Sequence, residues 1–231
     1  TSTAVDALIE NLTYANISDA PTSTRTLVLD VIDASGNGLG GSTSSAGPFT
    51  FISLTGTADP LYGIDVGSYA AQTFVDFDGD GNLDLITGAN HGRFETYHNT
   101  GNGFNVLSGT ANPLYNVDIG AYSTPVAVDL NRDGKLDLVA GNSYGRLVAF
   151  ENTGVGFMAL SGESNPFNGI DIGSYSTPTF ADINGDGELD LVVGDSYGRL
   201  SAFENTGSRY AVLSGTNNPF GEIDIGSRSA P

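Results

Sequence analysis

The stretch Val128-Asp-Leu-Asn-Arg-Asp-Gly-Lys-Leu-Asp-Leu138 decides the fold, because two close copies of it stand elsewhere in the chain. One copy is Val75-Asp-Phe-Asp-Gly-Asp-Gly-Asn-Leu-Asp-Leu85, and the other is Ala181-Asp-Ile-Asn-Gly-Asp-Gly-Glu-Leu-Asp-Leu191. Each copy begins 53 residues after the one before it. A fixed period of this length is the signature of a repeat protein.

A second marker keeps the same period. The pattern Leu-Ser/Thr-Gly followed by Asn/Asp-Pro starts at Leu54, Leu107, Leu160 and Leu213, again 53 residues apart. The chain therefore contains three complete repeats and part of a fourth. Their approximate bounds are 48–100, 101–153, 154–206 and 207–231.

Each repeat is predicted to form four strands. In the second repeat these are residues 104–107, 124–130, 136–140 and 146–151, with a glycine-bracketed hairpin at 141–145. Several strands are apolar on both faces, which indicates that neighbouring sheets cover each small sheet on both sides. The fold class is therefore predicted to be all-β, a β-propeller-like array of four-stranded blades.

Residues 1–45 stand outside the repeat region, which covers 46–231. Segments 8–15 and 26–32 are predicted as two strands, and the Gly/Ser-rich segment 35–45 as a flexible linker. Two strands are too few to fold independently. This region is therefore interpreted as the remnant of an upstream β module.

Composition narrows the function classes. The chain of 231 residues has 27 acidic and 8 basic residues, a formal net charge of −19, which excludes nucleic acid and anionic membrane surfaces as partners and favours cations. It has no cysteine, so disulfides, thiolate metal sites and cysteine nucleophiles are excluded. No apolar run reaches the roughly 18 residues of a membrane span, so membrane insertion is not expected.

The repeated acidic segment predicts a divalent cation site in each complete repeat. Acidic or amide side chains at positions 1, 3, 5 and 9, with a backbone carbonyl at position 7, supply the oxygen ligands that hard cations require, and Gly at position 6 provides the bend. The predicted side-chain ligands are Asp76, Asp78, Asp80 and Asp84; Asp129, Asn131, Asp133 and Asp137; and Asp182, Asn184, Asp186 and Asp190. The predicted carbonyl ligands are those of Asn82, Lys135 and Glu188, whose side chains are then free to vary.

This segment has two alternative interpretations. An EF-hand begins in the same way but needs Glu at position 12 and flanking helices, whereas Thr87, Ala140 and Val193 stand there within β-like sequence. The other alternative is a solvated Asp/Gly turn without metal. Clustered acids repel one another, and three occurrences of the cluster favour the metal interpretation.

The stretch from Ser123 through Val128-Asp-Leu-Asn-Arg-Asp-Gly to Leu147, continuing in Glu151-Asn-Thr-Gly154, resembles the FG-GAP/VCBS repeat family. The resemblance covers about residues 46–231. It implies blades of integrin-alpha-like β-propellers, about three Ca²⁺ ions in the hairpin loops, and an extracellular or cell-surface location. Residues 1–40 more loosely resemble the end of a cadherin-like or Ig-like repeat of large bacterial surface proteins.

The number of blades departs from that family, whose propellers usually have seven. Three and a half repeats cannot close such a ring alone. Either the chain is a fragment of a longer protein, or copies self-associate through unpaired blade edges into a ring or filament. The fragment interpretation is preferred.

The preferred function is a calcium-binding structural or adhesive module without enzymatic activity, with a glycan or a protein as partner at a surface. The first loop, with four carboxylates, is expected to bind calcium most tightly. A self-assembling surface protein is one alternative. A lectin is another, with Tyr144, Arg146, Tyr197 and Arg199 as candidates; the first repeat has His91 and Arg93 there, and a packed hairpin is the favoured interpretation.

An accessory domain of a polysaccharide-active enzyme is the least favoured function. Catalysis needs a constellation that the other repeats lack. His91 and His98 alone stand out, and they replace Tyr or Glu of the other repeats. Drift within a repeat is the preferred explanation for both.

Overall fold

The computed structural model describes residues 53–207 and 209–226, which include all three acidic segments. The chain divides into two compact units, Thr1–Thr55 and Gly56–Pro231, and the fold given below is that of the second unit. The two-strand module and linker predicted for residues 1–45 lie outside the described residues.

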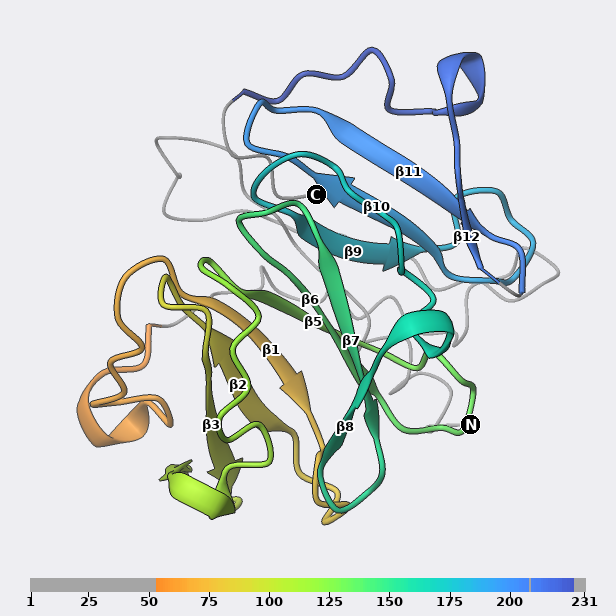
Figure 1. Ribbon diagram of the computed structural model, residues 1–231. Coiled ribbons are helices and arrows are strands. Elements are labelled where there is room, and N and C mark those ends of the chain that lie inside the picture. Colours follow the sequence, from red (N-terminus) through yellow and green to blue (C-terminus); the bar gives the residue numbers. More distant parts are fainter. Residues whose placement is uncertain (1–52, 208, 227–231) are drawn as a thin grey trace, which may run out of the picture. The chain divides into compact units, whose positions relative to one another are not determined.

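Twelve strands in the described residues pair into three four-stranded antiparallel sheets, and each sheet is a meander in sequence order. The predicted all-β array of four-stranded blades is thereby confirmed. Figure 1 shows the sheets in gold, green and blue. The first sheet contains β1 (Ala71–Val75), β2 (Asp84–Gly88), β3 (Phe94–Asn99) and β4 (Phe104–Leu107); the second contains β5 (Thr124–Val128), β6 (Asp137–Gly141), β7 (Leu147–Asn152) and β8 (Phe157–Leu160); the third contains β9 (Thr177–Ala181), β10 (Asp190–Gly194), β11 (Leu200–Asn205) and β12 (Tyr210–Val212).

Short 3-10 helices are the helical elements of the described residues, and each has three residues. Within 53–207 and 209–226, none of these helices has the length and apolar character that crossing a membrane requires. They are η1 (Gly56–Ala58), η2 (Gly109–Ala111), η3 (Gly162–Ser164) and η4 (Gly215–Asn217).

The strands are grouped differently from the order expected within one repeat. Residues 104–107, expected to open the second repeat, form β4 and pair with β3 at the outer edge of the first sheet. Residues 157–160 likewise form β8 and close the second sheet. A blade therefore takes its outer strand from the start of the following 53-residue unit, because a period fixes the length of a repeat but not where a sheet begins.

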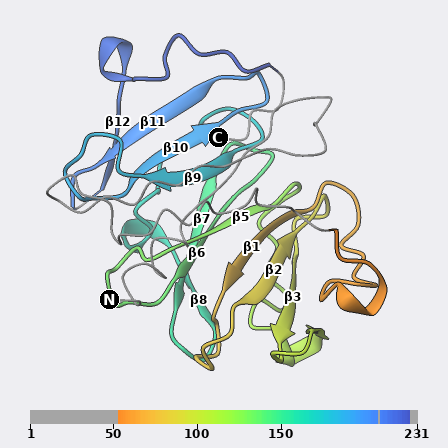
Figure 2. The same cartoon turned by 180° about the vertical axis from the view of Figure 1, so that it is seen from behind.

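The second sheet is covered on both faces, as the apolar strands predict. Along β6, Leu138 and Ala140 belong to a core cluster with Ile86 of the first sheet, and Val139 belongs to a second cluster with Leu191 of the third sheet. Alternate residues of a strand point to opposite faces, so one strand serves both cores. Figure 2 shows the same middle sheet from behind.

Backbone contacts bring neighbouring blades close at two equivalent glycines. A Cβ atom added at Gly88 would overlap the carbonyl oxygen of Ser123, and one at Gly141 would overlap that of Ser176. Both serines are fully buried, and their hydroxyls accept hydrogen bonds from backbone N–H groups of the preceding blade, at 3.1 Å from Ala89 and 2.7 Å from Asn142. Glycine is therefore required where the second strand of one blade meets the next blade.

A row of tyrosines also links the blades. Tyr69, Tyr122 and Tyr175 are 53 residues apart, and each has a left-handed backbone, with φ of 59°, 59° and 58°. Their rings contact in turn, with centroid distances of 5.2 and 4.9 Å. A bulky residue adopts positive φ only at a cost, and aromatic contacts of about 0.5–1.5 kcal/mol each offset it.

Candidate metal centre

The three acidic segments are hairpin loops that join the first and second strands of each sheet. The glycine at position 6 has φ of 89°, 85° and 86° at Gly81, Gly134 and Gly187, which confirms its expected role in the bend. Position 4 is Gly79 and Gly185 in the first and third loops, but Arg132 in the second, where φ is 62°. The second loop therefore carries a strained residue that the other two lack.

The aspartate at position 1 folds the first and third loops around its carboxylate. Asp76 accepts hydrogen bonds from Gly79 N at 2.7 Å and from Gly81 N at 2.9 Å, one on each oxygen. Asp182 accepts the equivalent bonds in the third loop, and the bond from the Gly187 backbone lowers the pKa of the Asp182 carboxyl. Backbone N–H groups thus enclose the carboxylate at position 1 in both loops.

Asp129, at position 1 of the second loop, lacks one of these bonds. Its Oδ2 accepts a hydrogen bond from Gly134 N at 3.0 Å, but its Oδ1 is buried without a hydrogen-bond partner. A buried carboxylate oxygen without a partner is unfavourable unless a cation lies against it. The donor set of the loop is all oxygen, so this orphan oxygen fits a site for a hard cation.

Positions 3 and 5 form a chain of tight turns. The side-chain oxygen at position 3 accepts the backbone N–H of position 5, and that at position 5 accepts the backbone N–H of position 7. The hydrogen bond from Asn82 N lowers the pKa of Asp80. The donor–acceptor distances are 3.1 and 2.8 Å in the first loop, 2.9 and 2.9 Å in the second, and 2.9 and 2.8 Å in the third.

The aspartate at position 9 is buried and lies where each loop joins its second strand. Asp84, Asp137 and Asp190 are 0%, 1% and 0% exposed, and both oxygens of each accept backbone hydrogen bonds. Burial raises the pKa of Asp84 and Asp137. The donors are Phe77, Leu130 and Ile183 at position 2 of each loop, and Asn99, Asn152 and Asn205 at the end of the third strand.

Those asparagines hold the loops through hydrogen bonds, and they are not among the predicted site residues although they recur every 53 residues. Each donates a side-chain hydrogen bond to the carbonyl of position 8, which is Leu83, Leu136 or Leu189. Asn152 also donates to the carbonyl of Asp76, at 3.2 Å, and so connects the second blade to the first loop. The period itself was the signal that could have found them.

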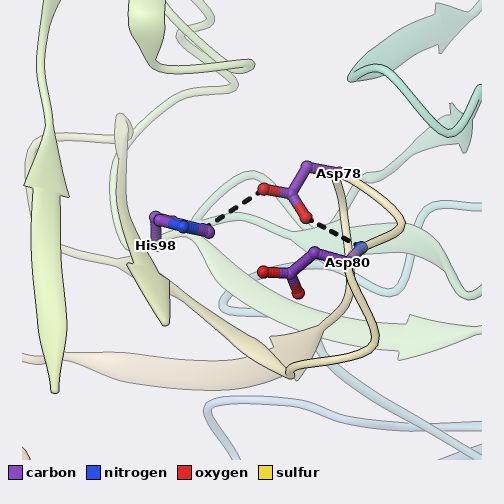
Figure 3. Close-up of side chains that lie close together, drawn as sticks. All are labelled: Asp78, Asp80 and His98. Carbon is purple, nitrogen blue, oxygen red and sulfur yellow. Dashed lines mark hydrogen bonds and ion pairs between the residues drawn. The ribbon is translucent and has the colours of Figure 1, made fainter. Parts of the chain in front are cut away.

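Acidic ligand atoms converge most closely in the first loop. Oxygens of Asp76, Asp78 and Asp84 lie within 4.8 Å of one another, and so do ligand atoms of Asp78, Asp80 and His98. Figure 3 shows His98 facing both aspartates of the second group. Among the described residues no other group of three acidic or histidine ligands lies as close, because Asn131 and Asn184 replace Asp at position 3 of the other loops.

Basic side chains contact the second loop instead. Lys135 Nζ lies 2.7 Å from Asp133 Oδ2, and this contact lowers the pKa of Asp133 and raises that of Lys135. Arg132 forms an ion pair with Glu188 of the third loop. The side chains at position 7, expected to be free to vary, thus make specific contacts: Lys135 contacts a predicted ligand of its own loop, and Glu188 contacts an arginine of the neighbouring loop.

Comparison with known proteins decides the family. The model of the FG-GAP-like repeat matches twice, at residues 76–140 and 129–193, and the two matches together span slightly more than half of the chain. This chain belongs to the FG-GAP-like repeat family. No curated protein matches it.

Among the matching solved structures is one that describes the specific recognition of non-reducing terminal N-acetylglucosamine by an Agrocybe aegerita lectin. The sequences are 18% identical and the TM-score is 0.42. The match covers 68% of this chain and 42% of the lectin chain. The FG-GAP-like chain described here thus spans less than half of that lectin's length.

The aromatic and arginine pairs of the FG-GAP-like hairpins take packing roles. The Tyr144 ring lies against Gly120, where a Cβ atom would come within 2.8 Å of it. In the next repeat, Arg199 lies over the Tyr197 ring, with the guanidinium carbon 5.3 Å from the centroid, and pairs with Asp195. His91 Nδ1 accepts a bond from Arg93 N within its own turn.

Proposed function

We propose that this chain is a non-catalytic structural module of an extracellular or cell-surface protein, and that calcium stabilises it by binding the three hairpin loops. The observation that carries the proposal is the buried Oδ1 of Asp129, which has no hydrogen-bond partner within an all-oxygen loop. Membership of the FG-GAP-like family and the convergence of Asp76, Asp78 and Asp84 support it.

The residues that would hold the ion are those at positions 1, 3, 5 and 9, with the carbonyl at position 7. Calcium would supply positive charge that offsets the repulsion among three or four acids in one turn. The chain's own contribution is the hydrogen-bonded frame of the loop. Backbone N–H groups orient one oxygen of each side chain at positions 3 and 5, and both oxygens of the aspartate at position 9. The buried aspartate at position 9 fixes the base of the loop to the third strand.

Stabilisation follows from selective binding to the folded state. At a calcium concentration ten times the Kd, each site adds roughly 1.4 kcal/mol, so three sites add on the order of 4 kcal/mol. Three ions would also offset part of the net charge of −19. The cation is therefore proposed as a structural component of the blades.

The test compares thermal unfolding with calcium and with excess chelator. In the triple variant Asp76→Asn, Asp129→Asn and Asp182→Asn, we expect the calcium-dependent rise in Tm to disappear. The matched control replaces Asp118, Asp171 and Asp224, which accept the same type of turn hydrogen bond outside the loops, and should keep the rise. A wild-type chain that does not respond to calcium, or a loop variant that responds like the wild type, contradicts the proposal.

Glycan binding is a second candidate, favoured by a hollow of about 1280 Å³ beside the second hairpin. Tyr144 and Arg146 line it together with Asp118, Asp171 and Asn168, and the Tyr144 side chain is 65% exposed. An exposed aromatic ring among polar groups suits a sugar ring. Binding of the wild type to a glycan array that is lost in Tyr144→Ala would support this function. A wild type that binds no glycan on the array would exclude it.

A further inference from the structure

His98 gives the first loop a nitrogen ligand that the other loops lack. It lies on β3, and its Nδ1 is 3.2 Å from Asp78 Oδ2 and 3.2 Å from Asp84 Oδ1. A ligand atom of Asp80 lies within 4.8 Å of the ligand atoms of both His98 and Asp78 (Figure 3). An imidazole and two carboxylates therefore face one point at the mouth of the loop.

The other repeats place a different pair at these two positions. Where the first repeat has Asp78 and His98, the second has Asn131 and Glu151, and the third has Asn184 and Glu204. In the first repeat, the loop position thus has a carboxylate where the other repeats have an amide, and the strand position has an imidazole where they have a carboxylate. The two substitutions lie in contact, so they alter one site together instead of two unrelated positions.

The fully buried Asp84 keeps His98 in place. Asp84 Oδ1 accepts the Asn99 backbone N–H at 2.8 Å and faces His98 Nδ1. The same ring nitrogen, Nδ1, faces both Asp78 and Asp84, so an ion bound at Nδ1 would take the place of a proton between the imidazole and these carboxylates. The His98 side chain is 29% exposed, so an ion can reach it from solvent.

We propose that the first loop binds a divalent transition-metal ion, with Zn²⁺ as the representative, through His98, Asp78 and Asp80, and prefers it to calcium. Calcium takes oxygen ligands almost exclusively, whereas imidazole with carboxylate suits zinc and its first-row neighbours. The inference rests on the proposed function in that all three loops are cation sites that bind calcium when it is the only divalent ion present. It adds that zinc displaces calcium from the first loop, while the second and third loops keep calcium.

The test measures zinc binding by isothermal titration calorimetry on the untagged chain in excess calcium, which saturates the oxygen-only loops. We expect one zinc site in the wild type, with affinity reduced at least tenfold in His98→Glu. Glu is the residue of the two sister repeats at this position, so the variant should fold. His91→Glu, which changes the only other histidine of the chain, is the matched control and should bind zinc like the wild type.

A spectroscopic readout tests the ligand itself. Cu²⁺ bound to the wild type should show nitrogen superhyperfine splitting in its electron paramagnetic resonance spectrum, and the splitting should disappear in His98→Glu but persist in His91→Glu. Equal zinc affinity of wild type and His98→Glu, or splitting that survives in His98→Glu, overturns the inference.

Failure of this inference can be told apart from failure of the proposed function. If His98→Glu binds zinc like the wild type while calcium still raises Tm in both, the zinc inference fails and the calcium proposal stands. If zinc binding depends on His98 but calcium stabilises neither chain, the calcium proposal fails and the zinc inference stands.

Discussion

The first and second loops share most of one backbone frame and differ mainly in the side chains around it. Both have a bend at the glycine of position 6 and a fully buried aspartate at position 9. The first loop adds His98 to its carboxylates, whereas Lys135 contacts a carboxylate of the second loop at 2.7 Å. Under the proposed function, the hydrogen-bonded frame would set where a cation lies, and a few side chains around it would set which cation is favoured.

The largest expected effect concerns the part that the loops share. Asp84→Ala and Asp137→Ala should each lower the free energy of unfolding by about 2–4 kcal/mol, because each removes both acceptors of two backbone N–H groups at a buried position. Urea denaturation in excess chelator measures this without the contribution of metal. A cost below 1 kcal/mol for either variant would contradict a shared frame. The control is Asn131→Ala, which removes a single hydrogen-bond acceptor at an exposed position and should cost less than either aspartate variant.

Exchanging the differing pair should exchange the ion preference. The double variant Asp78→Asn with His98→Glu should bind zinc at least tenfold more weakly, and Asn131→Asp with Glu151→His should gain a zinc site in the second loop. Calorimetric titration of both variants with zinc measures the two changes. Zinc affinity that stays with the first loop after the exchange would show that the pair does not set the preference.

Replacing Lys135 by a neutral residue should raise the calcium affinity of the second loop. Lys135→Gln leaves Asp133 without its 2.7 Å cationic partner, so the calcium affinity of this loop should rise roughly three- to tenfold at low salt. Calcium titrations at low and high ionic strength check the change, which should shrink as salt increases. Lys135→Arg keeps the charge and is the control; an equal rise in both variants would contradict the electrostatic explanation.

The smallest effect concerns the strained position 4 of the second loop. Arg132→Gly and Arg132→Ala both remove the ion pair with Glu188, but only glycine relieves the left-handed backbone, φ 62°. The glycine variant should therefore be more stable than the alanine variant by about 1 kcal/mol. Chemical denaturation of the two variants gives the difference directly, and equal stabilities would show that position 4 is not strained.

The repeat length, the strands and the bends of the loops could be predicted, because they depend on local patterns that recur every 53 residues. The segment 146–150, whose apolar residues indicated cover on both faces, lies largely in β7, where Leu147, Ala149 and Phe150 are buried and Val148 is half-buried. The period does not show how the strands group into sheets. Residues 104–107, like their equivalents in the other repeats, lie between two strands, and the period is the same whether they pair with the strand before them or with the one after.

His98 was interpreted as drift, because its contact depends on strand register. Leu85 of β2 pairs with Tyr97 of β3, and the next residues along the two strands, Asp84 and His98, therefore meet across the ladder. No local pattern in the sequence specifies that register. The assignment of metal ligands at positions 1, 3, 5, 7 and 9 stays a prediction.

The most direct test is a crystal structure grown with calcium and soaked with zinc, with anomalous data collected on both sides of the zinc absorption edge. We expect calcium in the second and third loops, and zinc beside His98 in the first. Absence of an ion from all three loops would contradict the central claim that these hairpins are cation sites. Calcium in all three loops, with zinc in none, would contradict the distinction between the first loop and the others.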